Sequence, residues 1–267
     1  MRTLKLTLAY DGSEFYGWQL QPNLPTIQGT LLDTLRKLTQ EKPRLYGCGR
    51  TDAGVHALGQ VAHFKTRTQI PAENMRRALN SLLPPSVRVL AVEEVAPNFH
   101  SRWHALAKTY RYRILRAPIC PPHLWRYVYH YPYPLDEEVM GRAAPRFEGE
   151  RDFSSFGTWD PEEENRSRVR IVYSSRLERL PEQHELVYTV RGKSFLRYMV
   201  RKMVGTLIDV GKGRLGPEDI HRIFTARDRS QAGPTVPPEG LYLVAAEYPV
   251  QSEPATIASA QSQTDSV

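Results

Sequence analysis

Residues 46–64 read YGCGRTDAGVHALGQVAHF, in which two β-like segments flank a loop with two glycines. Residues 44–48 are short and β-like, and apolar and polar side chains alternate over residues 60–65. A glycine stands on each side of Asp52, so the backbone of this loop can bend tightly and a bound molecule can approach it closely. We therefore expect two strands joined by a loop on a rigid scaffold, where functional residues often lie.

The segments on either side of this loop complete a β-α-β-β-α-β order. Alternating apolar residues predict a strand over residues 4–10, and Thr26 can cap a helix over residues 26–40. A helix that opens on a proline is predicted over residues 71–83, and a strand over residues 87–93. This is the order of elements in a ferredoxin-like fold.

The second half of the chain repeats a similar order, although no repeat is visible in its sequence. Its expected elements are a strand at 107–115, a helix at 135–147, strands at 169–177 and 185–191, a long helix at 194–210, a helix at 217–225 and a strand at 241–248. We therefore predict an α+β protein of two ferredoxin-like, RRM-like halves, at 1–98 and 104–249, whose sheets join and leave a cleft between them. The tail at 250–267 is rich in Ser, Gln, Ala and Thr, and we expect it to be disordered.

The positive charge of the chain is concentrated in segments that are also rich in aromatic residues. The 267 residues include 36 Lys and Arg against 29 Asp and Glu, a formal charge of +7. Residues 95–135 and 191–202 contain no acidic residue but many Arg, Lys, Tyr and Trp or Phe side chains. Arginine binds phosphate and aromatic rings stack on bases, so this pattern favours nucleic-acid binding over a merely solvated basic face.

Several functional classes are disfavoured by the sequence. No apolar run approaches the roughly 20 residues of a membrane span, and the alternating N-terminus is unlike a signal peptide. The two cysteines, Cys48 and Cys120, are far apart, which argues against a disulfide framework or a cysteine zinc site. His100 and His104 have no third ligand nearby in sequence, so no metal site is expected. A cytoplasmic protein is the default expectation.

Several motifs along the chain, in order, resemble those of the tRNA pseudouridine synthase A family, the bacterial tRNA pseudouridine(38–40) synthases. Residues 46–64 resemble the signature loop of that family. Further similar segments are LAYDGSEFYGWQLQPNLPTIQGTL (8–31), KTYRYRI (108–114), RDFSSF (151–156), FLRYMVRKMVGTLIDVGKG (195–213) and PPEGLYLV (237–244). Together they cover residues 4–248, and several motifs in the expected order are far more specific than a lone Asp-Ala-Gly.

The resemblance implies a role for each matching residue. Asp52 matches the catalytic aspartate, Arg201 the basic residue that pairs with it, and Tyr110 the tyrosine that packs on the target base. Arg50 matches an arginine that helps to hold the flipped nucleotide, and Leu243 lies where the family lines the base pocket. The resemblance also implies the pseudouridine synthase fold, with a central, mostly antiparallel sheet and flanking helices, and a homodimer that acts without a cofactor on the anticodon stem-loop of tRNA at positions 38, 39 and 40.

These residue types suit that reaction. The N1–C1′ bond of uridine breaks, the uracil turns, and C5 bonds to C1′, so one carboxylate near the ribose suffices as a nucleophile or as a base, and the sequence leaves both routes open. Burial would raise the pKa of Asp52, and we expect Arg201 to lower it and to fix the direction of the carboxylate. For Tyr110 we favour stacking over proton transfer, because the usual pKa of a phenol is about 10.

The target uridine must leave its stack to reach Asp52, and basic side chains would then track the phosphates. The candidates for these RNA contacts are Arg102, Lys108, Arg111, Arg126, Arg191 and Lys193.

Each of these residues also has a simpler structural role that the sequence allows. Asp52 could cap its own turn, Arg201 could lie on a helix surface, and Tyr110 could be a core residue of its strand. The whole chain could be a non-catalytic RNA-binding module of two RRM-like halves, or another enzyme that acts on bases. A binding module needs no carboxylate in a basic cleft, where it would repel phosphate, so Asp52 with Arg201 separates these hypotheses.

Overall fold

The computed structural model describes residues 1–158 and 167–249, and the predicted tail at 250–267 lies outside them. The strands are β1 (Arg2–Tyr10), β2 (Leu45–Gly47), β3 (His56–Thr66), β4 (Val87–Val95), β5 (Ala107–Leu115), β6 (Tyr129–His130), β7 (Gly149–Asp152), β8 (Val169–Leu180), β9 (Glu185–Gly192) and β10 (Leu241–Glu247). The α-helices are α1 (Ile27–Thr39), α2 (Ala72–Leu82), α3 (Glu137–Ala143), α4 (Met199–Gly211) and α5 (Asp219–Ala226).

The strands of the described residues form one sheet in the order β4-β1-β3-β10-β5-β9-β8-β7, with β2 beside β3 and β6 beside β5. All strand pairs are antiparallel except β10 with β3 and β5 with β6. The first half contributes the order β4-β1-β3-β2 and the second half the matching order β10-β5-β9-β8. The α+β class and the mostly antiparallel joined sheet are therefore confirmed.

Local sequence explains the first helix well. Thr26 has an extended backbone, and its hydroxyl accepts a hydrogen bond from the Gly29 N–H at 3.2 Å, which satisfies one of the free N–H groups of the helix start. Ile27, Leu31 and Leu35 lie on one face of α1 and are completely buried in the core against the sheet. The predicted helix at 26–40 is confirmed.

The long helix begins later than the expected residue 194. Tyr198 has a left-handed backbone with φ of 63°, and a residue in that conformation cannot belong to a right-handed helix, so α4 starts at Met199. The preceding turn packs Phe195 against Tyr110 in an edge-to-face contact, with ring centroids 5.0 Å apart. The apolar periodicity of the sequence did not reveal this turn, because the turn is held by the contact of Phe195 with Tyr110 on β5.

Strand β3 begins earlier than the expected residue 60. His56 pairs with Tyr242 and Ala57 with Leu243 of β10, which extends β3 into the end of the signature loop. The pairing partner is far away along the chain, so the local pattern could not predict this extension. β10 thereby joins the second half of the chain to the first.

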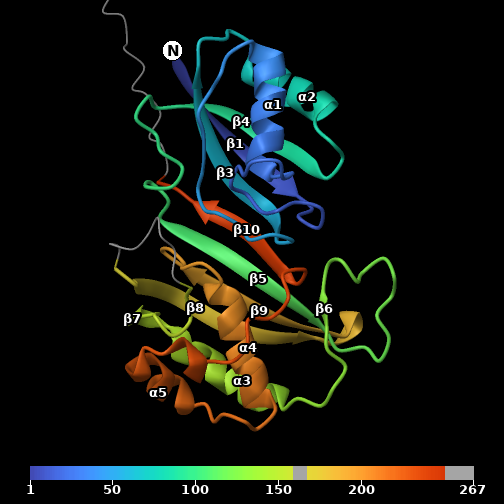
Figure 1. The fold of residues 1–267 in the computed structure, drawn as a ribbon, viewed down its shortest axis with the longest axis vertical. Helices are drawn as coiled ribbons and strands as arrows, with labels where there is room; N and C mark the ends of the chain where they lie inside the picture. The colour runs from blue at the N-terminus through green and yellow to red at the C-terminus, as the bar shows by residue number, and fades with distance from the viewer. Residues whose placement is uncertain (159–166, 250–267) are drawn as a thin grey trace, which may run out of the picture.

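One row of directly paired residues crosses this junction from one half to the other. It runs through Tyr10, Ala57, Leu243, Tyr110 and Val190 on five neighbouring strands. Paired residues point to the same face of a sheet, so these side chains share one face. Figure 1 shows β10 and β5 between two groups of helices, α1 and α2 on one side and α3, α4 and α5 on the other.

Among residues 1–158 and 167–249, the helices are too short or too polar to cross a membrane.

Candidate active site

A buried polar network holds the signature loop between β2 and β3. The Tyr10 hydroxyl lies 2.8 Å from the Thr51 hydroxyl, and the Gln60 amide donates to the carbonyl oxygen of Gly49 at 2.9 Å. The Cys48 thiol in turn donates to the Gln60 side-chain oxygen at 2.9 Å. These groups are buried and satisfied by one another, so the loop has a fixed backbone before any substrate arrives.

The segment after β1 covers the loop from the other side. Trp18 N–H donates to the carbonyl oxygen of Thr51 at 3.0 Å, and Gly54 N–H donates to that of Phe15 at 3.2 Å. Gly17 has φ of +85°, and a Cβ there would lie 2.6 Å from the Thr51 oxygen. Only glycine fits this close backbone approach, which explains why the segment can pack on the loop.

His56 braces the end of the loop. Its Nδ1 accepts a hydrogen bond from the Gly12 N–H at 3.1 Å, so Nε2 carries the proton and donates to the carbonyl oxygen of Arg126 at 3.0 Å. The ring also stacks on Tyr242 with centroids 4.8 Å apart. Burial lowers the pKa of His56, with nearby Asp11 opposing, so the neutral ring suits these partners.

Asp52 and Arg201 meet across the two halves of the molecule. Arg201 Nη1 donates to Asp52 Oδ2 at 3.1 Å, and the side chains of Asp52 and Arg201 are only 16% and 12% exposed. Arg201 lies on α4, and its Nε donates to the carbonyl oxygen of Val236 at 2.8 Å. Its guanidinium lies 5.1 Å from the centroid of the Tyr198 ring. Three contacts therefore fix the cation that faces the carboxylate.

The electrostatic balance at Asp52 differs from the expectation. Burial raises the pKa of Asp52 above its usual value, and the charges of Arg201 and Arg197 offset this only in part. We expected the Arg201 guanidinium to lower the pKa of Asp52 overall. The Asp52 side chain is buried so deeply that the effect of burial on its pKa exceeds that of Arg201. The raised pKa makes the ionised carboxylate more basic than an ordinary aspartate, which suits either a base or a nucleophile.

Tyr110 and Leu243 lie next to each other on the shared face of the sheet, and Tyr110 is close enough to Asp52 to be affected by its charge. They are cross-strand partners on β5 and β10, and both are buried. A Cβ added at Gly49 of the signature loop would lie 3.6 Å from the Tyr110 hydroxyl. Burial raises the pKa of Tyr110 well above its usual value, and Asp52 is among the nearby groups that add to this rise. Tyr110 thus stays protonated at neutral pH, which favours packing over a role as a base.

Arg50 lies on the exposed side of the signature loop. Its Nε donates to the Gln19 side-chain oxygen at 3.1 Å. The structure thus brings Asp52, Arg201, Tyr110 and Leu243 into one region, and places Arg50 at its margin.

The expected RNA contacts are divided between several surfaces. Lys108 is buried, and its Nζ would lie 3.7 Å from a Cβ at Gly49, so it lies under the signature loop. Arg111 and Arg191 alternate with Tyr110 and Val190 along their strands, so their side chains project from the opposite face of the sheet.

Arg191 and the other three candidates lie at or near the surface. Arg191 makes two hydrogen bonds to the Glu247 carboxylate, at 2.7 and 2.6 Å. Arg126 lies 3.3 Å from Glu14, Lys193 is exposed after β9, and Arg102 is half-buried beside a hollow. Their roles in RNA binding stay predictions.

Gln60, Val236 and Tyr198 are the positioning residues that the sequence did not reveal. Gln60 holds the loop, while Val236 and Tyr198 hold Arg201. Gln60 and Tyr198 lie within the quoted motifs, at residues 46–64 and 195–213, but their types gave no sign of a positioning role. Val236 acts through its backbone carbonyl, which leaves no signal in a sequence. In the described part of the chain, no group of three or more His, Cys, Asp or Glu side chains gathers as a metal site.

Most of the sequence matches a known family. A family model described as tRNA pseudouridine synthase matches residues 7–104 and 143–249. This chain belongs to the tRNA pseudouridine synthase family. The resemblance seen in the motifs is thereby confirmed, and both matched segments contain residues of the Asp52–Arg201 region.

Three curated relatives similar to this chain share the name tRNA pseudouridine synthase A. The protein from Solibacter usitatus is 49% identical over 249 residues, which cover 93% of this chain and 100% of that protein. Those from Caldicellulosiruptor saccharolyticus and Caldicellulosiruptor bescii are 44% and 45% identical over 248 residues, with the same coverage of both chains.

Proposed function

We propose that this chain isomerises uridine to pseudouridine in the anticodon stem-loop of tRNA, at positions 38, 39 and 40, with Asp52 as the catalytic residue. Family membership supports the isomerisation and the tRNA substrate. The observation that carries the catalytic assignment is the buried carboxylate of the signature loop, 3.1 Å from Arg201 and close to Tyr110.

The reaction leaves the atomic composition of the nucleotide unchanged. The N1–C1′ bond breaks, a C5–C1′ bond forms, the proton on C5 leaves, and N1 gains a proton. Asp52 either attacks C1′ or removes a ribose proton, and its raised pKa serves both routes. Tyr110 offers a ring face that holds the detached uracil in any orientation while it turns.

The flipped nucleotide needs contacts outside the reacting atoms. A uridine in a stem must be extruded before it can reach Asp52, and Arg50 at the margin of the loop is placed to hold its phosphate or sugar. Leu243 supplies an apolar wall beside Tyr110. The same proposal includes RNA contacts by the remaining basic residues, a cytoplasmic location, and a homodimer that needs no cofactor, the last two as the family resemblance implies.

A non-catalytic RNA-binding module is a poorer account of the same geometry. Burying a carboxylate costs free energy, and a carboxylate next to bound RNA repels phosphate. An RNA-binding surface would gain from losing Asp52, whereas an isomerase requires it.

The substrate assignment is tested with tRNA transcripts that contain C5-tritiated uridine. We expect tritium release when uridine stands at positions 38, 39 or 40, and none when all three are cytidine. Equal release from both transcripts would contradict the assignment to the anticodon stem-loop. A binding module would release no tritium from either transcript.

A further inference from the structure

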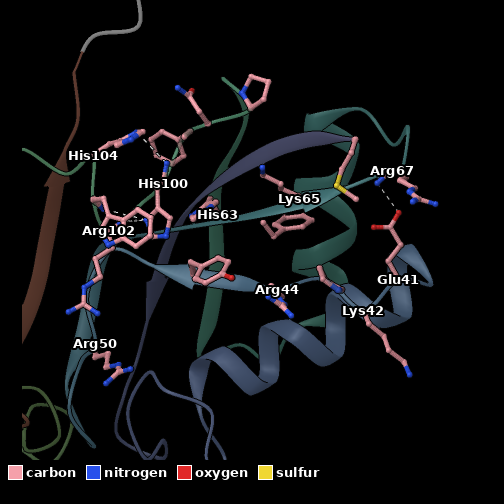
Figure 2. Close-up of a pocket in the computed structure, with 18 residues that line it drawn as sticks. Glu41, Lys42, Arg44, Arg50, His63, Lys65, Arg67, His100, Arg102 and His104 are labelled. Carbon is pink, nitrogen blue, oxygen red and sulfur yellow. Dashed lines mark hydrogen bonds between the residues drawn. The ribbon is translucent and has the colours of Figure 1, made fainter. Parts of the chain in front are cut away.

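A hollow of about 1020 Å³ lies beside β2, between the end of α1 and the linker that follows β4. We call it the basic groove, because six cationic side chains line it. They are Lys42, Arg44, Arg50, Lys65, Arg67 and Arg102. Figure 2 shows Arg50 and Arg102 toward one end of the groove, and Lys42 and Arg67 toward the other. The charge is thus spread along the groove and is not gathered at one point.

One acidic residue, Glu41, also lines the basic groove, and it is already engaged. Its carboxylate accepts hydrogen bonds from the Thr66 hydroxyl at 2.8 Å and from the Arg67 N–H at 2.9 Å. The cations therefore keep a strong net positive charge. A groove of this length and charge suits a polyanion, and it exceeds what a single phosphate would fill.

The basic groove also carries exposed aromatic rings. The Trp103 side chain is 74% exposed, and its ring stacks on His100 with centroids 3.9 Å apart and planes 13° apart. Tyr46 is 42% exposed and stacks on His63 at 5.2 Å. Burial lowers the pKa of His63 to about 4, so this ring is uncharged at neutral pH. Supported, exposed rings beside cations are the surface on which unpaired bases stack.

The basic groove begins at the signature loop. Arg50 lines it and stands two residues before Asp52, a span of roughly 7 Å at most for an extended chain. A nucleic-acid strand that enters the groove near Arg50 is therefore close to the nucleotide bound at Asp52.

We propose that the basic groove binds an unpaired stretch of the RNA substrate outside the target nucleotide. Its phosphates lie along Lys42, Arg44 and Arg102, and one unstacked base lies on the Trp103 ring. This inference rests on the proposed activity on tRNA, and it assigns a second contact region to the same substrate.

The test measures the Kd for tRNA at several salt concentrations, alongside tritium release. Trp103→Ala is expected to weaken binding roughly 5- to 150-fold through the loss of one stacked base, and Trp103→Phe to stay within about twofold of the wild type. The double variant Lys42→Gln/Arg44→Gln is expected to reduce the slope of log Kd against log salt by about 1 to 2. The control Arg146→Gln/Arg176→Gln removes two exposed arginines that do not line the groove, and its slope is expected to be unchanged.

The outcomes separate this inference from the proposed function. One outcome is that the wild-type enzyme releases tritium while both groove variants keep the wild-type Kd and salt slope. That outcome would overturn RNA binding in the basic groove and leave the proposed isomerase activity unaffected. If the groove variants bind tRNA more weakly but the wild-type protein releases no tritium, RNA binding in the groove is supported and the proposed function is overturned. A change in oligomeric state with unchanged tRNA affinity would overturn the inference in favour of an interface between two copies of this chain.

Discussion

Arg201 is positioned by contacts that do not involve a substrate. The Val236 carbonyl, the Tyr198 ring and the Asp52 carboxylate each fix one part of its guanidinium. A charged group held in this way needs no reorganisation during the reaction, which is where electrostatic catalysis gains most of its effect. Its contribution should therefore appear in the chemical step and not in RNA affinity.

Replacing Arg201 by methionine tests this positioning role. We expect kcat to fall about 100-fold or more while the Kd for tRNA changes less than about threefold. The active form of Asp52 is ionised, and Arg201 opposes the rise of its pKa. Removing Arg201 raises that pKa further, so the acidic limb of the pH–rate profile should move to higher pH.

Arg197→Met is the matched control, because its guanidinium contacts Tyr198 and no hydrogen bond joins it to Asp52 in the described structure. Arg197→Met should reduce kcat less than Arg201→Met does, and it should shift the acidic limb of the pH–rate profile less. If Arg201→Met instead loses binding and turnover in equal proportion, Arg201 is a phosphate contact.

The sequence predicted which residues meet at the site better than it predicted how deeply their side chains are buried. The motif resemblance placed Asp52 and Arg201 together, and they lie 3.1 Å apart. The direction of the Asp52 pKa was missed, because it depends on how deeply distant segments such as residues 11–18 and α4 bury the loop. Burial of one side chain is a property of the packed fold and not of its motif.

Helix α4 and the segment before β10 act as one packed unit. Lys202 Nζ donates to the carbonyl oxygen of Gly233 at 2.8 Å, and Gly233 N–H donates to the Thr206 hydroxyl at 3.0 Å. A Cβ at Gly205 would lie 1.8 Å from the Pro234 carbonyl oxygen. This close contact places the nearby Val236 carbonyl against Arg201.

Gly205→Ala should separate these two segments. We expect a loss of about 1–3 kcal/mol in the free energy of unfolding, and a fall in kcat because Val236 moves away from Arg201. Gly141→Ala in α3 is the control, since its Cβ would meet nothing within 4 Å. That change should be neutral or stabilise the protein by about 0.5–1 kcal/mol. Equal stability of the two variants in urea unfolding would contradict the packing argument.

Element boundaries were predictable where local signals set them. Thr26 supplied a cap, and the start of α1 was placed correctly. The starts of α4 and β3 were misplaced, because a contact of Phe195 with Tyr110 and the pairing of His56 with Tyr242 decide them. Both are long-range contacts, which periodicity cannot report.

The whole molecule depends on β10 as a junction. This strand lies between β3 of the first half and β5 of the second, and Leu243 at its centre is completely buried. The proposed boundaries at 1–98 and 104–249 stay a prediction, and β10 from the second range pairs directly with β3 from the first. We therefore expect the two halves to unfold together.

Leu243→Ala should reveal this coupling. Removing the buried side chain is expected to cost about 2–5 kcal/mol of unfolding free energy. Hydrogen exchange under native conditions should then become faster in both β1 and β9, since one cooperative unit contains both strands. Faster exchange in β9 alone would show that the halves unfold separately.

The position of the basic groove could not be predicted from the sequence. Its cations come from the segment after α1, from the signature loop, from the end of β3 and the residue after it, and from the linker after β4. Apart from the signature loop, none of these segments is distinctive alone. The net charge predicted a nucleic-acid partner, but only the fold brings these cations together along one surface.

The most direct test of the central claim is tritium release from C5-tritiated uridine in tRNA by Asp52→Ala. With tRNA at saturating concentration, we expect no release above background, while the Kd for tRNA stays within about threefold of the wild type because the carboxylate contributes chemistry and not affinity. Turnover at the wild-type level would contradict the assignment of Asp52 as the catalytic residue.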